Sequence, residues 1–162
     1  MKPFPPLFAR MAALALAALV LSSCSGKVRR VSPPAASIQQ LTVQANGDWA
    51  VDLRLHNYSS MSMRFDSVRL EVSVDEHVAG TVEVRPGISI GPSSADVASA
   101  TLKPSAIARM AVADALASRR SLAYRLKGTA AATPDETSKS RDFEVDDRSQ
   151  LNPAPGLDGV LR

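Results

Sequence analysis

The stretch Trp49-Ala50-Val51-Asp52-Leu53-Arg54-Leu55-His56 decides the fold of this chain. Apolar side chains occupy every second position, and small or polar side chains stand between them. A period of two is typical of a β-strand with one face buried and the other in water, as in antiparallel sheets. The stretch therefore predicts a half-buried antiparallel strand, and its phase places Trp49 in the core.

The same period continues upstream of this strand. Residues 37–45 alternate in the same way and are joined to Trp49 through Asn46-Gly47. Both residues of this dipeptide tolerate positive φ, which favours a tight hairpin turn. Ile38 is out of phase with the apolar positions that follow it, so we expect a β-bulge near Gln39-Gln40.

Six more segments downstream have strand character and are separated by turn signals. Asp75-Glu76-His77 predicts one such turn, and after it Val78 and Val82 are expected to point inward with Gly80 in phase. Seven to eight short strands with turns between them indicate a mainly β protein, an antiparallel β-sandwich. The six segments are 64–74, 78–84, 88–90, 95–102, 122–127 and 141–145.

One segment, 104–119, changes to a helical period and predicts one short helix starting near Pro104-Ser105. A membrane-surface helix is less favoured here, because Arg109 is its only basic residue before the end. After the helix, Gly128 is expected to end the strand 122–127, and residues 130–140 are expected to form a polar loop. The apolar helix face is expected to contain Ile107, Met110, Val112, Ala113 and Leu116.

Residues 1–23 have the pattern of a signal peptide: Lys2 and Arg10 precede the uncharged run Met11–Leu21. This run is too short to span a membrane, which takes about 20 apolar residues. The stretch Leu21-Ser22-Ser23-Cys24 resembles the lipobox of bacterial lipoproteins, which implies a lipoprotein signal peptide and acylation (palmitate) at Cys24. A buried helix or an uncleaved anchor is the alternative for this segment.

The predicted organisation follows from this signal. Residues 24–35 form a flexible tether, because Ser, Gly and Pro33-Pro34 disfavour regular structure; 36–146 form the β-sandwich domain, and 147–162 a loose C-terminal tail. The membrane is then a partner through the lipid anchor. Ser25 rather than Asp follows the cysteine, which by resemblance to lipoprotein sorting favours the periplasmic face of the outer membrane.

Charge excludes one class of partner. The 162 residues carry a formal net charge of +3, but without Lys2 and Arg10 there remain 17 basic against 16 acidic side chains. A near-neutral domain has no electrostatic footprint for nucleic acid, so no nucleic-acid partner is expected. A single cysteine allows no intramolecular disulfide, so packing and hydrogen bonds must hold the fold.

Candidate chemistry is sparse, and we predict no catalytic residue, no metal site and no cofactor. Gly87-Ile88-Ser89-Ile90-Gly91 fits G-x-S-x-G, but no helical pattern follows it, so Ser89 is expected on a short strand. His56 and His77 lack the spacing of metal ligands. Asp146-Asp147 is expected in a solvated turn rather than a calcium site, and an aromatic surface of Trp49 with Tyr58 is less favoured than Trp49 in the core.

Four features follow one another in a recognisable order: Ala36-Ser37-Ile38, 51–57, 68–72 with 78–80, and 124–128 with the strand of Phe143. Through them, residues 36–146 resemble the type 2 late embryogenesis abundant proteins, also called the water-stress and hypersensitive-response domain. Asn57 is followed by Tyr58, whereas the family has Asn-Pro-Asn at this point. The resemblance implies an immunoglobulin- or fibronectin-III-like sandwich without enzymatic activity, of which bacterial members are commonly envelope lipoproteins.

The sequence thus predicts a membrane-anchored envelope lipoprotein that is not an enzyme. Its sandwich would act as a binding or protective module related to desiccation and stress tolerance. The alternative is a structural lipoprotein subunit of an envelope assembly, such as a secretion apparatus. Envelope protein partners are expected in either case, without an identity that the residues specify.

Overall fold

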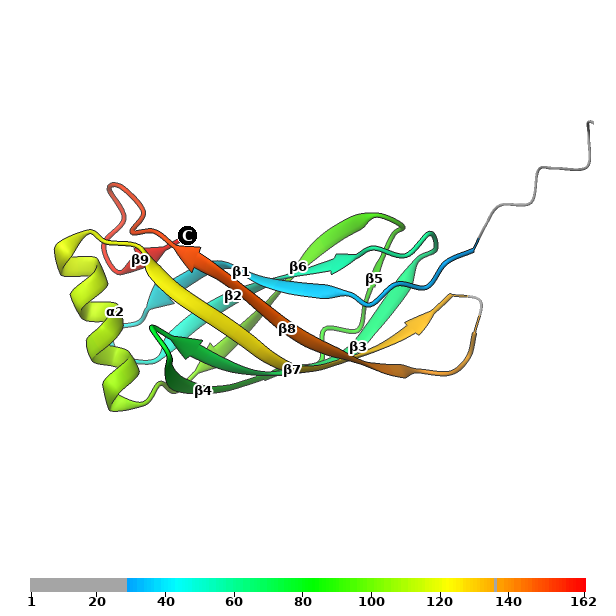
Figure 1. Cartoon of the computed structure of the whole chain (residues 1–162), viewed down its shortest axis with the longest axis horizontal. Coiled ribbons are helices and arrows are strands. Elements are labelled where there is room, and N and C mark those ends of the chain that lie inside the picture. Colours follow the sequence, from blue (N-terminus) through cyan, green and yellow to red (C-terminus); the bar gives the residue numbers. More distant parts are fainter. Residues whose placement is uncertain (1–28, 136) are drawn as a thin grey trace, which may run out of the picture.

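A computed structural model describes residues 29–135 and 137–162, so the signal segment 1–23 and Cys24 lie outside the described residues. In the described part, nine strands form two antiparallel sheets that pack as a β-sandwich with one helix, α2 (Ala106–Ser118) (Figure 1). This confirms the predicted fold class. No helix among the described residues has the length and apolar composition needed to cross a membrane.

Each sheet combines strands that are distant in the sequence. The first sheet has the order β6-β2-β1-β9, with β1 (Ala35–Val43), β2 (Trp49–Asn57), β6 (Ser94–Leu102) and β9 (Val160–Leu161). The second has the order β4-β3-β7-β8, with β3 (Met63–Val74), β4 (His77–Val84), β7 (Leu122–Pro134) and β8 (Arg141–Leu151). In addition to β4, the short β5 (Ile88–Ile90) pairs with β3, at the beginning of that strand.

The apolar faces of both sheets meet in an aliphatic core. Trp49, Val51, Leu53 and Leu55 are each at most 1% exposed, as the alternation of β2 predicts. Their counterparts in the second sheet are also completely buried. Those counterparts include Val68, Leu70, Val72, Val74, Leu122 and Leu126.

The two predicted hairpins form, with local differences. The pairing of β1 with β2 shifts between Ile38 and Gln40, which confirms the predicted bulge. Their connection is longer than a two-residue turn, because β1 ends at Val43 and β2 begins at Trp49, and Gly47 takes the positive φ of 84°. Between β3 and β4, Asp75 and Glu76 both take positive φ, as a tight hairpin turn requires.

A register shift corrects the predicted orientation of β4. The pairing of β3 with β4 is irregular between Val72 and Ser73, so the phase of β4 changes after Val78. Val78 is consequently 52% exposed, whereas its neighbour Ala79 is buried. The prediction that Val78 points inward is therefore wrong, because an irregular pair adds one residue to one strand.

The helix forms where it is predicted, but with a different buried face. The Ser105 side chain accepts a hydrogen bond from the Ala108 backbone and caps the helix N-terminus. Ala108, Val112 and Ala115 are the buried residues, spaced one and two turns apart. The expected face is corrected accordingly, because three of its members, Ile107, Met110 and Ala113, are exposed.

Two segments predicted as a loop and a tail are partly strands. β7 continues past Gly128 to Pro134, through the first part of the predicted polar loop, and pairs with β8 from Leu122 to Ala132. A Cβ atom at Gly128 would lie 2.1 Å from the Arg69 carbonyl oxygen, so glycine allows β3 and β7 to approach. The predicted loose tail 147–162 is also corrected: β8 extends to Leu151, and Leu161 in β9 pairs with β1 and is fully buried.

The sandwich has two unlike ends (Figure 1). The entry end comprises residues 29–34, the loops 58–62 and 91–93, and residues 135 and 137–140, with hydrogen bonds such as those of Ser60 to Arg30, Ser93 to Ser59 and Asp135 to Ser62. The helix end comprises α2 and the loops 44–48 and 152–159, with the C-terminus beside them (Figure 1). The chain therefore enters the described fold at the end opposite its helix.

Candidate functional site

Asn57 is the buried residue around which the entry end is built. It is 1% exposed, and its side-chain nitrogen lies 2.8–3.0 Å from the carbonyl oxygens of Met61, Ile90 and Gly91. Its side-chain oxygen accepts a hydrogen bond of 2.9 Å from the Ser59 backbone. A buried amide is costly without partners, so these contacts account for a polar residue at this place. They join β2 to the β2–β3 loop and to the end of β5.

The chain before β1 is bound to the same loop. The Arg30 backbone nitrogen donates to Ser60 Oγ at 2.7 Å, and the Ser60 nitrogen donates to the Arg30 carbonyl at 2.9 Å. The Ser32 nitrogen donates to Oγ of the fully buried Ser59 at 2.9 Å. The predicted flexible tether of 24–35 is therefore corrected for residues 30–32, which are held on the sandwich. Residues 24–28 lie outside the described part.

Side chains of the second sheet cover the open edge of β1. β9 pairs with β1 only at Leu41 and Thr42, which leaves the first half of this edge without a neighbouring strand. There the Ala36 nitrogen donates to Asp147 Oδ2 at 2.8 Å, and the Ile38 nitrogen donates to the Tyr124 hydroxyl at 3.0 Å. Such contacts satisfy edge N–H groups that could otherwise pair with another strand.

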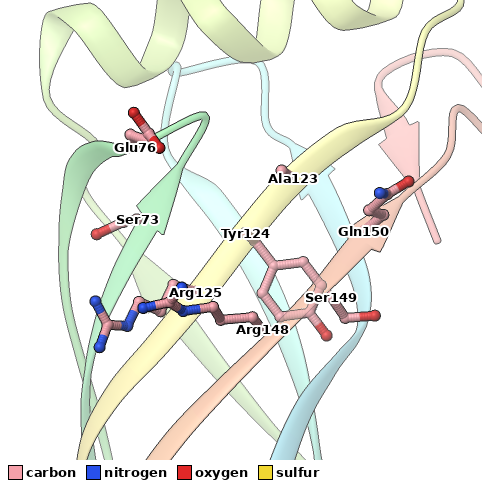
Figure 2. Close-up of a pocket in the computed structure, with 8 residues that line it drawn as sticks. All are labelled: Ser73, Glu76, Ala123, Tyr124, Arg125, Arg148, Ser149 and Gln150. Atoms are coloured by element: carbon pink, nitrogen blue, oxygen red, sulfur yellow. The ribbon is translucent and has the colours of Figure 1, made fainter.

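On the outer face of the second sheet, two arginines stand directly opposite each other. Arg125 in β7 pairs in register with Arg148 in β8. They border a hollow of about 610 Å³, which we call the arginine hollow (Figure 2). Figure 2 shows both arginine side chains extending toward the β3–β4 hairpin. The hollow is lined by Ser73, Glu76, Ala123, Tyr124, Arg125, Arg148, Ser149 and Gln150.

The two arginines differ in their partners. Arg125 binds Asp146 in a bidentate way, with Nε 2.7 Å from Oδ1 and Nη2 2.5 Å from Oδ2. This hydrogen bond is the main reason that the pKa of Asp146 is lowered, and the charges of Arg125, Arg148 and Lys127 add to it. Within residues 29–135 and 137–162, no carboxylate lies within ion-pair distance of Arg148.

The predicted solvated turn at Asp146-Asp147 is wrong, because both residues lie within β8. Asp146 points to the outer face and holds Arg125, whereas Asp147 reaches the backbone of β1. In the described part of the chain, no group of three His, Cys, Asp or Glu residues is arranged to hold a metal ion.

The other candidate residues are dispersed. Ser89 is an exposed residue of β5 opposite Arg64, and a turn follows it, so it lacks the strand-to-helix geometry of a nucleophile elbow. His77 is exposed at the start of β4, while His56 stacks on Tyr58 with ring centroids 5.7 Å apart. Trp49 is buried, which confirms its place in the core rather than on a surface with Tyr58.

A second, smaller hollow lies along the edge between β1 and β8. Its volume is about 180 Å³, and its lining includes His56, Tyr58 and Asp147. It shares Tyr124, Arg148 and Ser149 with the arginine hollow, so these three residues stand between the two depressions. The sequence pattern does not indicate Arg148, because the residues after 146 predict a loose tail. The alternation of 122–127 places Arg125 outward, but only the strand register reveals its neighbour.

Comparison with known proteins finds low similarity. No family model and no curated protein matches the chain. A protein from Archaeoglobus fulgidus is similar in structure, with 10% identity and a TM-score of 0.42 over 77% of this chain and 98% of the other. The β-sandwich assignment therefore rests on the strand order and burial of this chain.

Two solution structures show a similar level of likeness. A protein from Arabidopsis thaliana has 12% identity and a TM-score of 0.45, covering 81% of this chain and 84% of its own. A protein described as late embryogenesis abundant has 14% identity and a TM-score of 0.45, covering 90% and 82%. Membership of that family stays a prediction from the residues quoted above.

Proposed function

We propose that this protein is a membrane-anchored envelope lipoprotein whose sandwich is a non-catalytic binding or protective module. The lipobox-like stretch ending at Cys24 supports the anchor, and the sequence resemblance to type 2 late embryogenesis abundant proteins supports a role in desiccation or stress tolerance. The observation that carries the proposal is the attachment of Arg30 and Ser32 to the β2–β3 loop. It supports the anchor, because a lipid on Cys24 would be only six residue positions before Arg30, which the sandwich holds.

This attachment limits how far the domain can stand from a lipid on Cys24. Six residue steps separate Cys24 from Arg30, and a fully extended chain spans about 3.5 Å per residue, which gives about 20 Å. The entry end would then face the membrane, and α2 with the C-terminus would face away from it (Figure 1). Ser25 supports the periplasmic face of the outer membrane as the location.

Replacement of the cysteine tests the anchor. We expect Cys24→Ser to remove the lipid mass from the mature protein and to move the protein from the membrane to the soluble fraction. Mass spectrometry and membrane fractionation measure the two effects, with Ser25→Ala as the matched control that keeps the acylated residue. Unchanged mass and unchanged membrane partition in Cys24→Ser would refute lipidation. For the sorting proposal, Ser25→Asp should shift the protein to the inner membrane.

A second candidate function is a structural subunit of an envelope assembly. The observation that favours it is the apolar surface at the helix end, where Ile107 is 59% and Met110 is 73% exposed, one turn apart on α2. Mild crosslinking followed by purification separates the two functions. A stable, stoichiometric set of envelope proteins, lost in Met110→Glu, would support the assembly subunit and contradict the protective module.

A further inference from the structure

We propose that the arginine hollow binds an anionic group, a phosphate or a carboxylate, between Arg148 and Arg125. This inference rests on the proposed binding function and specifies its ligand chemistry. Phosphate and carboxylate share oxygens that accept hydrogen bonds from guanidinium groups, which suits the planar fork of arginine donors. The ligand would lie on the outer face of β7 and β8, away from the core.

The first argument is the repulsion between the two arginines. Like charges directly opposite each other on neighbouring strands destabilise a sheet. Asp146 compensates Arg125, but no described carboxylate pairs with Arg148. Both side chains belong to the outer face, so neither is required to fill the core. An anion bound between them would remove the repulsion and satisfy the free guanidinium.

The second argument is that one half of the site is already held in place. The bidentate contact with Asp146 fixes the Arg125 guanidinium, so little side-chain entropy would be lost there on binding. Arg148 then supplies the donors that are free. Figure 2 shows Ser73 between Glu76 and the arginines, so the one carboxylate that lines the hollow lies on its far side. The anion is therefore expected on the side of β7 and β8.

The third argument is the local charge. Lys127 pairs in register with Asp146, so three cations, Arg125, Lys127 and Arg148, gather around this one carboxylate of β8. Glu71, opposite Lys127 in β3, is the nearest further acid in the register of the sheet. Among the outward residues of β7 and β8 at the hollow, these three cations stand against Asp146, whereas Glu71 and Glu76 belong to β3 and to the turn after it. The positive side of the hollow is therefore the side of β7 and β8.

Titration of the full-length protein in neutral detergent tests the proposal. Inorganic phosphate and acetate are added in separate series at constant ionic strength, with chloride as the exchanged ion, and backbone amide shifts are followed by NMR. We expect saturable shifts confined to residues 123–125 and 148–150 in at least one series. The series with the tighter binding shows whether the natural ligand carries a phosphate or a carboxylate.

Variants decide whether the arginines carry the binding. Arg148→Ala should weaken binding at least about tenfold, because hydrogen bonds between charged groups are lost, and Arg148→Lys should retain part of it. Arg69→Ala is the matched control, since Arg69 lies on the same outer face but pairs with Glu83 and does not line the hollow. It should leave the affinity unchanged.

Several results would overturn the proposal. These are shifts that do not saturate, shifts spread over all arginine-bearing strands, or equal affinities in the unaltered protein and Arg148→Ala. The outcome is independent of the lipid anchor, because Cys24→Ser should bind the same anion with the same affinity. Failure of anion binding with a confirmed lipid would therefore remove only this inference, and failure of lipidation would leave it intact.

Discussion

At the entry end, buried polar side chains hold the loops together, with Asn57 bonded to three carbonyl oxygens and Ser59 bonded to the incoming chain. At the helix end, α2 covers the same core with the small apolar side chains of Ala108, Val112 and Ala115. Both ends exclude water from an aliphatic sandwich. One end does so with directional hydrogen bonds and the other with packing.

The difference has a physical consequence. Removal of a buried hydrogen-bonding side chain leaves its partners unsatisfied in a low-dielectric interior, so the loss is large and specific to one residue. Removal of an apolar side chain costs an amount graded by the volume and area lost. The entry end should therefore depend on single residues more strongly than the helix end does.

The largest effect is expected at Asn57. Asn57→Ala leaves the carbonyl oxygens of Met61, Ile90 and Gly91 without this donor and should lower the free energy of unfolding by about 2–4 kcal/mol. Urea denaturation measures the change. Asn46→Ala is the matched control, because its exposed side chain bonds only Asp48 within one turn, and it should cost less than about 1 kcal/mol. Equal losses in the two variants would contradict the role of Asn57.

A smaller effect is expected at the helix end. Val112→Ala removes two buried methyl groups and should cost about 1–2 kcal/mol, because a buried CH₂ contributes about 0.8 kcal/mol. Met110→Ala on the exposed side of the same helix should change stability by less than about 0.5 kcal/mol. Thermal unfolding of both variants compares the buried and the exposed side of α2. An equal or larger loss in Met110→Ala would contradict the exposed position of Met110.

The smallest effect concerns pH at the entry end. The Asp66 carboxylate accepts hydrogen bonds from Thr133 at 2.7 Å and Ser140 at 3.1 Å and contacts Arg64 at 2.9 Å. The hydrogen bond from Thr133 is the main reason that the pKa of Asp66 is lowered. Its stabilising contribution is therefore present above the unfolded-state pKa of about 3.9 and is lost as the pH falls through the lower folded-state value.

Comparison of two variants isolates this contribution. Between pH 5 and pH 2, in steps of about one unit, the unaltered protein should lose more stability than Asp66→Asn, which cannot ionise at this position. Asp158→Asn, in the exposed loop at the helix end, should follow the unaltered protein. Parallel stability curves for the unaltered protein and Asp66→Asn would contradict this contribution.

Much of the fold can be predicted from local patterns. The alternation from Trp49 to His56 places each of its apolar residues correctly, because strand geometry turns consecutive side chains to opposite faces. The turn at Asp75-Glu76 and the bulge after Ile38 also follow from neighbouring residues. The helix is correct in position for the same reason, since Ser105 and the alanine-rich segment act within a few residues.

The predictions from the sequence are wrong where packing against a distant strand decides which residues are buried. The phase of Val78 depends on an irregular pair with β3, and the buried face of α2 depends on which surface of the sandwich the helix meets. The segment 148–162 has few apolar residues and many turn residues, so its pattern alone indicates a tail. Its order comes from pairing with β7 and β1, whose partners lie far away in the sequence.

The sequence by itself determined the strand periods, the turns, the near-neutral charge after residue 23 and the expectation of a lipid on Cys24. These properties depend on residues that are adjacent in the sequence, so no contact between distant residues is needed to specify them. Only the tertiary structure decided that Asp147 bonds Ala36, 111 positions away, and that Arg148 stands opposite Arg125. Such pairs exist because strand register brings distant residues together, and register is a property of the packed sheets.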